Sequence, residues 1–280
     1  MMLRYFPGHY SSTIPSKIEI HKKQQKIFEN GPMVINGVDL NEQQQIELLL
    51  SFSKRLGEFD FPENPVSSKR YYFNNPMYKF NDAFILYNFL HEFSPGQIIE
   101  IGSGFSSALT LDTLDLQNKK QTTKLVFIEP NPEKLYSLIS KEDNFNNTII
   151  EKNIQDVSLD IFDKLGRNDI LFVDTSHVLK VDSDLSTIMF SILPRLKEGV
   201  IIHFHDIFWP FEYPRPVFNA GRNWNEAYIL RTFLQYNDNF EIIFFSSYLE
   251  CCHRNLILEK MPGYLKSTGS SLWLRRKSAN

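Results

Sequence analysis

Four side chains lie near the ends of two short apolar runs and have the types needed for acid-base or metal chemistry. Asp174 ends one run and is followed three residues later by His177. The neighbours His205 and Asp206 end the next run. Two carboxylates and an imidazole, at Asp174, Asp206 and His205, can hold a divalent ion that orients a hydroxyl and lowers its pKa. Imidazole suits Zn, Fe, Mn or Ni better than Mg, so the identity of the ion stays open.

His177 is the predicted catalytic base, with Asp174 beside it. An imidazole that titrates near neutral pH can accept a proton from a hydroxyl. A lone histidine is also a common structural hydrogen-bonding residue, and that interpretation stays open beside the catalytic one.

A second constellation lies earlier in the chain, where Gly102 and Gly104 stand between an apolar run and a helical pattern. Glycine permits a tight turn and lets bare backbone approach a ligand closely. Glu129 ends the next apolar run, and a carboxylate there can accept hydrogen bonds from both hydroxyls of a ribose. Ser107 occupies the place of the third glycine of the dinucleotide fingerprint, which disfavours a pyrophosphate site. The pattern predicts a pocket for a nucleoside.

Two further acids complete the predicted nucleoside pocket. Glu100 lies directly before the glycine turn, where a carboxylate could reach the amino-acid part of a nucleoside cofactor. Asp156, with Gln155 beside it, follows the third apolar run, where a side chain could bond the adenine amino group. The predicted cofactor-binding residues are Glu100, Gly102, Ser103, Gly104, Ser106, Ser107, Glu129, Gln155 and Asp156.

Short apolar runs alternate with helical patterns, and these elements must position both groups of residues. The predicted strands cover residues 97–101, 124–128, 147–151, 169–173, 199–204, 240–246 and 271–275. Fully apolar runs belong to parallel strands that are covered on both faces, so we predict an α/β fold with a doubly wound, mostly parallel seven-stranded sheet. Only a loop region, 260–269, separates the last two runs, which predicts an antiparallel last strand.

The first 80 residues differ from the rest of the chain. They are rich in Pro, Asn, Gln and aromatic residues, and one helical pattern begins near residue 40. We predict a mainly helical or irregular extension at 1–80, which serves as a cover or as the arm of a homo-oligomer. Residues 81–280 are the predicted cofactor-binding domain and begin with an apolar helical pattern.

The composition argues against several classes of protein. A formal net charge of −3 provides no excess of positive charge for binding nucleic acid, and it favours a small-molecule or sugar partner. No run of apolar residues is long enough to span a bilayer, so we expect no membrane partner. Cys251 and Cys252 are adjacent, which argues against a disulfide framework and for a reducing, cytoplasmic location.

The segment after the second pair of candidate ligands is rich in aromatic residues and proline, and we interpret it as a substrate wall. Trp209, Tyr213 and Trp224 can stack on a sugar or an aromatic ring. Arg215 and Arg222 can bind a carboxylate or a phosphate. Simple packing of a long loop on the domain explains the same residues equally well.

Over most of residues 81–280 the sequence resembles the S-adenosylmethionine-dependent methyltransferase superfamily. Glu-Ile-Gly-Ser-Gly at 100–104 resembles its first motif, Phe-Ile-Glu-Pro at 127–130 its second and Asp-Ile-Leu-Phe-Val-Asp at 169–174 its fourth. The string His-Phe-His-Asp-Ile-Phe-Trp-Pro-Phe-Glu-Tyr-Pro at 203–214 is similar to a bacterial subgroup often found among polysaccharide and natural-product genes. The resemblance implies a class I, Rossmann-like fold with S-adenosylmethionine as cofactor.

The resemblance also bears on the catalytic residues. Metal-dependent O-methyltransferases of the catechol and macrolide-sugar types carry ligands at the strand ends matched here by Asp174 and Asp206, whereas His205 stands where they usually have an acid. In the catechol type, a Lys general base occupies the position of His177.

We therefore predict O-methylation of a small molecule or sugar, with one divalent metal ion as a candidate second cofactor. N-methylation on the same fold stays open, as does a binding or scaffold protein without turnover. An NAD(P)-dependent oxidoreductase is disfavoured by the absent third glycine and by the lack of a Tyr-x-x-x-Lys pair.

Overall fold

The computed structural model describes residues 4–28 and 34–278 of the chain, and its centre is a seven-stranded sheet in the order β3-β2-β1-β4-β5-β7-β6. The strands are β1 (Gln97–Ile101), β2 (Lys124–Ile128), β3 (Thr148–Ile150), β4 (Ile170–Val173), β5 (Ile201–Phe204), β6 (Phe240–Phe245) and β7 (Leu272–Arg276). Strands β1 to β5 pair in parallel, and β7 is antiparallel to both β5 and β6. The predicted α/β fold, with an antiparallel last strand, is confirmed.

The last strand does not follow a simple loop. The segment before it contains α10 (Ser246–Cys252) and α11 (Arg254–Lys260), which the sequence pattern did not reveal. Strand β7 then enters the sheet between β5 and β6, so β6 is an edge strand.

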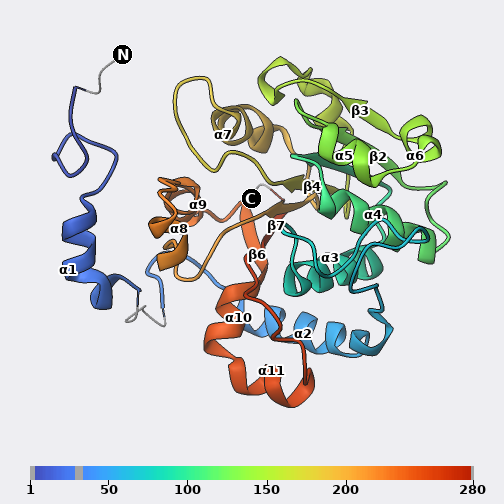
Figure 1. Ribbon diagram of the computed structural model, residues 1–280, viewed down its shortest axis with the longest axis horizontal. Coiled ribbons are helices and arrows are strands. Elements are labelled where there is room, and N and C mark those ends of the chain that lie inside the picture. The colour runs from blue at the N-terminus through green and yellow to red at the C-terminus, as the bar shows by residue number, and fades with distance from the viewer. Residues whose placement is uncertain (1–3, 29–33, 279–280) are drawn as a thin grey trace.

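Helices surround the sheet (Figure 1). The remaining α-helices are α1 (Lys17–Phe28), α2 (Glu42–Ser53), α3 (Phe80–Phe93), α4 (Phe105–Leu116), α5 (Glu133–Leu138), α6 (Lys141–Asn146), α7 (Asp184–Thr187), α8 (Arg215–Asn219) and α9 (Glu226–Leu234). Helix α3 packs on α4, which follows the turn after β1, and α4 packs on α5. None of the helices in the described part of the chain is long and apolar enough to cross a membrane.

Helix α3 is buried on all sides from Phe80 to Leu90, as expected of a helix that is apolar around most of its circumference. Its last residue, Phe93, is followed by Ser94 in a left-handed conformation with a φ of 45°, and then by Pro95. A left-handed residue followed by proline is a common helix stop, since proline cannot continue the helix. The stop turns the chain directly into β1.

Residues 34–80 contribute to the same core as the sheet. Ile35, Leu49 and Phe52 are buried there. Helix α2 lies beside β6, where the Gln45 side-chain oxygen accepts a hydrogen bond from Phe245 N at 2.7 Å. This segment therefore packs against part of the sheet.

Arg70 ties the segment before α3 to α4 and α6. Its guanidinium contacts Asp112 and Asp115 of α4 and Asp143 of α6, each at 2.7 Å. Lys120 adds a second cation, 2.8 Å from Asp143. Burial of Asp143 opposes its charge, but the hydrogen bonds from Arg70 and Lys120 lower its pKa below the usual range.

Helix α1 lies at the margin of the molecule, on the side of α8 (Figure 1). None of its residues is buried, and the ring of Phe28 lies 6.4 Å from the ring of Phe218 in α8. Residues 4–28 therefore form an arm whose main neighbour in the described chain is α8.

Candidate active site

The turn between β1 and α4 requires glycine at residue 102. Gly102 has a φ of +84°, and a Cβ atom there would lie 1.6 Å from the backbone oxygen of Asp174. The β1 and β4 ends are thus so close that only a residue without a side chain fits. Gly104 is extended, and its nearest neighbour would be the Lys134 side chain at 3.9 Å, so its position leaves open space for a ligand.

Glu129 is fixed at the end of β2 by backbone donors from two directions. Ser103 N donates to one carboxylate oxygen at 3.2 Å, and Asn131 N donates to the other at 2.9 Å. Glu129 lines two adjoining cavities that both also contact Gly102 and Asp174. The carboxylate is therefore positioned before any ligand arrives.

Glu100 does not line either cavity. It is 1% exposed and accepts a hydrogen bond from Ser106 Oγ at 2.5 Å. Burial raises the pKa of Glu100 to about 8, so the group is mainly protonated at neutral pH. Ser107 Oγ accepts a hydrogen bond from Gly104 N at 3.0 Å and caps α4. Glu100 and Ser107 thus support the turn from beneath, instead of contacting a ligand as predicted.

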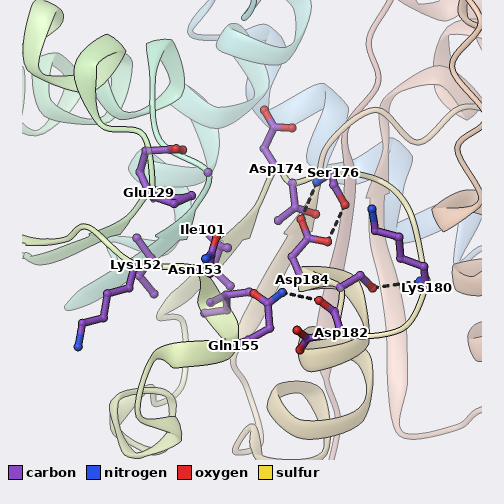
Figure 2. A pocket seen from close by; sticks show the side chains of 16 residues that line it. Ile101, Glu129, Lys152, Asn153, Gln155, Asp174, Ser176, Lys180, Asp182 and Asp184 are labelled. Atoms are coloured by element: carbon purple, nitrogen blue, oxygen red, sulfur yellow. Dashed lines mark hydrogen bonds between the residues drawn. The ribbon is translucent and has the colours of Figure 1, made fainter. Parts of the chain in front are cut away.

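The first of the two cavities, which we name the nucleoside cavity, has a volume of about 440 Å³ and lies between the ends of β2, β3 and β4 (Figure 2). Gln155 lines it and donates a hydrogen bond from Nε2 to Asp182 O at 2.7 Å. Asp156 is exposed and does not line it, because the short helix η2 (Ile154–Asp156) turns Gln155 inward and Asp156 outward. Of the two residues predicted to contact adenine, only Gln155 lines this cavity, together with its neighbours Asn153 and Ile154.

The second cavity, which we name the His177 cavity, has a volume of about 510 Å³ and contains the acid-base residues. His177 is 5% exposed and lies in the loop after β4 with a φ of +60°. Its Nδ1 lies 2.8 Å from a carboxylate oxygen of Glu226. Its Nε2 lies 3.6 Å from Asp174 and 3.8 Å from Asp206.

The start of α9 fixes the His177 loop through its backbone. Asn225 N and Glu226 N both donate to His177 O, at 3.1 Å and 3.3 Å. The Asn225 side chain accepts from Leu179 N at 2.7 Å and donates to Leu179 O at 3.2 Å. A left-handed φ is costly for a residue other than glycine, and these contacts hold His177 in it.

The environment of His177 favours its charged form. Burial opposes the charge, but the hydrogen bond to Glu226 and the nearby carboxylates of Asp174 and Asp206 raise its pKa to about 9. Without a ligand, the imidazole is therefore mainly protonated at neutral pH. It then neutralises part of the acid cluster around it.

The predicted metal ligands are neighbours, but they do not form a metal site as they stand. Within residues 4–28 and 34–278, no group of three or more His, Cys, Asp and Glu side chains is arranged to hold a metal ion. His205 Nε2 lies 3.9 Å from Asp206, and the His205 ring packs on Tyr78 at 5.2 Å. His177 Nε2 lies within 4 Å of both acids, 3.6 Å from Asp174 and 3.8 Å from Asp206.

Two of the five predicted substrate residues line the His177 cavity, namely Arg222 and Trp224. Trp209 instead packs on Tyr248, 4.8 Å away, and Tyr213 is buried behind Trp224. Arg215 lies at the start of α8 and lines a separate cavity toward α1. The apolar side chains of the loop after β5 turn into the core, which draws Trp209 and Tyr213 away from the site.

The comparisons with known proteins agree with this geometry. Residues 99–207 match the family model described as a methyltransferase domain. The chain therefore carries a methyltransferase domain over this segment. It also belongs to one family with an uncharacterized protein of Archaeoglobus fulgidus, which is 33% identical over 170 residues, 58% of this chain and 74% of that protein.

Solved structures with a similar outline share little sequence with this methyltransferase. The apo structure of CmcI aligns with 81% of this chain and 84% of its own, at 16% identity and a TM-score of 0.48. Podospora anserina methyltransferase PaMTH1, solved with S-adenosylhomocysteine, aligns with 96% of this chain and 100% of its own, at 14% identity and a TM-score of 0.45.

The residues of this methyltransferase fit S-adenosylmethionine. Ser103 Oγ and Thr175 Oγ1 are buried and have no hydrogen-bond partner among the described residues, and both line the His177 cavity. A buried hydroxyl without a partner is costly unless a ligand or water satisfies it. Together with the fixed Glu129 carboxylate, they offer polar contacts to the ribose and the amino-acid part of the cofactor.

Glu226 is the main residue of this site that the sequence analysis did not single out. It is 1% exposed. A signal was present: Glu226 shares the buried face of α9 with Ala227, Leu230 and Leu234. An acid on the apolar stripe of a helix needs a buried partner, and that partner is His177.

Proposed function

We propose that this methyltransferase transfers the methyl group of S-adenosylmethionine to a hydroxyl oxygen of a small-molecule or sugar acceptor, with His177 as the base. The observation that carries this proposal is the pairing of His177 with Glu226, which holds Nδ1 and leaves Nε2 at the His177 cavity. When bound, S-adenosylmethionine supplies an electrophilic methyl carbon whose bond electrons return to sulfur as the acceptor oxygen attacks.

The cofactor contacts that we propose are those that line the two cavities. Glu129 binds the ribose hydroxyls, since its carboxylate is oriented by two backbone donors. The amino-acid part of the cofactor is surrounded by Gly102, Ser103, Gly104 and Ser106. The adenine ring lies beside Gln155. This arrangement spans the carboxyl ends of β1 to β4, where ligands bind in open α/β sheets.

The acceptor hydroxyl is placed beside His177 Nε2, within reach of Asp174. The unprotonated imidazole accepts the hydroxyl proton, and Glu226 stabilises the charge that then appears on the ring. Because the pKa of His177 is about 9 in the ligand-free protein, the basic form is scarce at pH 7 and the rate rises with pH. The proposal assigns no step to a metal ion, because the protonated His177 imidazole already places a positive charge beside Asp174 and Asp206.

Calorimetry and turnover assays test the proposal together. The protein is titrated with S-adenosylhomocysteine, and formation of S-adenosylhomocysteine from S-adenosylmethionine is measured with hydroxyl-bearing and amine-bearing acceptors. His177→Gln should leave cofactor affinity nearly unchanged and lower turnover by about 10² to 10⁴-fold, the usual contribution of a positioned base.

His253→Gln is the matched control, because His253 pairs with Glu42 at 2.8 Å, far along the chain from the site. It should leave turnover unchanged. Unchanged turnover in His177→Gln would remove His177 as the base, and turnover only with amines would replace O-methylation by N-methylation. Failure of S-adenosylhomocysteine to bind would contradict the proposal as a whole.

A further inference from the structure

The His177 cavity carries two cationic side chains that form no ion pair with any carboxylate of the described residues. They are Lys134 and Arg222, and both are exposed. The guanidinium of Arg222 lies over the ring of Trp224, 4.8 Å from its centroid, and Lys134 Nζ lies 5.3 Å from the centroid of Phe105. Two cations without carboxylate partners in one cavity are available to an anion.

Charge is unevenly distributed within this cavity. Its inner end holds the carboxylates of Asp174 and Asp206 beside His177, so an anionic ligand group is repelled from there. Lys134 and Arg222 lie on the exposed rim. A ligand with one anionic end would therefore bind with that end at the rim and its neutral end near His177.

Trp224 connects the rim to the catalytic histidine. Its ring lies 4.3 Å from the ring of His177, with Arg222 over the same indole. Tyr213 supports Trp224 from behind at 5.6 Å, and the Tyr213 hydroxyl accepts a hydrogen bond from Ala227 N at 3.0 Å. A guanidinium held over an aromatic ring keeps its N–H donors free for bidentate binding of a carboxylate or phosphate.

We propose that the methyl acceptor carries an oxyanion, a phosphate or a carboxylate, that binds to Arg222 with Lys134 in support. Arg222 and His177 both contact the Trp224 ring, so we propose a small acceptor, of the order of a hexose in size, whose reactive hydroxyl lies apart from its anionic group. This inference rests on the proposed function, because it assigns to the acceptor the part of the His177 cavity that the amino-acid part of the cofactor leaves free.

Binding of simple probes to the protein saturated with S-adenosylhomocysteine tests this inference. The probes are glucose, glucuronate, glucose 1-phosphate and inorganic phosphate, titrated by calorimetry at low ionic strength. At least one anionic hexose should bind about tenfold or more tightly than glucose, as expected for one charge-assisted bidentate contact. The two anionic sugars distinguish a carboxylate acceptor from a phosphate acceptor.

Arg222→Gln should abolish this preference, and Lys134→Gln should weaken it by a smaller factor. Arg215→Gln is the matched control, because Arg215 lines the separate cavity toward α1. Equal affinity for glucose and the anionic hexoses, absence of anion binding, or an equal loss in Arg215→Gln would overturn the inference. Binding of S-adenosylhomocysteine is recorded first, so failure of the proposed function appears as loss of that signal and is distinct from failure of the anion site.

Discussion

The pairing of His177 with Glu226 leads to a quantitative prediction for Glu226→Gln. The substitution keeps the shape of the side chain and replaces a carboxylate, 2.8 Å from His177 Nδ1, with a neutral amide. A hydrogen bond to a charged group contributes about 1.5–3 kcal/mol, and one pKa unit corresponds to about 1.4 kcal/mol. The pKa of His177 should therefore fall by about 1 to 2 units from about 9. Asp174 and Asp206 remain and keep it above the ordinary value.

The pKa of His177 can be measured without knowing the acceptor. The imidazole carbon-bound protons are followed by NMR between pH 5 and pH 11, and the His177 signal is assigned by its loss in His177→Gln. Glu259→Gln is the control, because Glu259 is exposed and pairs with Lys260. An unshifted His177 titration in Glu226→Gln, or a wild-type value near 6.5, would refute the reasoning.

The same pair should make stability depend on pH in a defined direction. A folded-state pKa above the unfolded value contributes stability that is complete below about pH 6.5 and is lost as the pH rises through about 9. The free energy of unfolding should therefore decline across this interval in the wild type, and the decline should be smaller in Glu226→Gln. Urea unfolding at several pH values measures both.

Further changes at the cofactor site, in the core and in the solvent have defined outcomes. Glu129→Gln should weaken S-adenosylhomocysteine binding about tenfold or more in calorimetry, because one acceptor for the ribose becomes a neutral amide. Gly102→Ala should disrupt the turn and abolish cofactor binding, whereas Gly263→Ala, at a φ of +86° in open space, should cost only about 1–2 kcal/mol in urea unfolding. Arg70→Met should lower the free energy of unfolding by about 3–5 kcal/mol, because it removes the cation paired with the buried Asp112 and leaves Asp143 with Lys120 alone. Stability contributed by Asp143, whose folded pKa is depressed, should be present above about pH 4 and should fall at lower pH. Treatment with EDTA should leave turnover unchanged, and a loss that one divalent ion restores would contradict the arrangement that we propose around His177.

The sequence was sufficient to predict the sheet, because its strands are short apolar runs that recur between helical patterns. The entry of β7 between β5 and β6 was not predictable from those runs, since pairing order depends on contacts between distant residues. The two helices before β7 were missed for a related reason. They are only seven residues each, too short for a clear helical period.

The sequence identified residues that line the two cavities where a strand end fixes the direction of the side chain, as at Glu129, Asp174 and Asp206. The sequence did not predict the position of a side chain whose direction is set by a turn or by a helix that covers it. Glu100 precedes the glycine turn in sequence, but α4 covers it and Ser106 becomes its partner. Loop residues such as Trp209 can face either the cavity or the core, and apolar burial decided that choice in favour of the core.

Strand β6 lies at the edge of the sheet, where unpaired backbone groups can recruit a strand from another molecule. Helix α2 prevents this, since Gln45 accepts from Phe245 N and Asn41 donates to Ile242 O at 3.2 Å. Recombinant versions that begin near residue 81 would retain every motif of the methyltransferase domain and lose this protection. Such truncated proteins should aggregate through β6 during expression. Restoring the segment that contains α2 should reduce this aggregation more than lowering the expression temperature does.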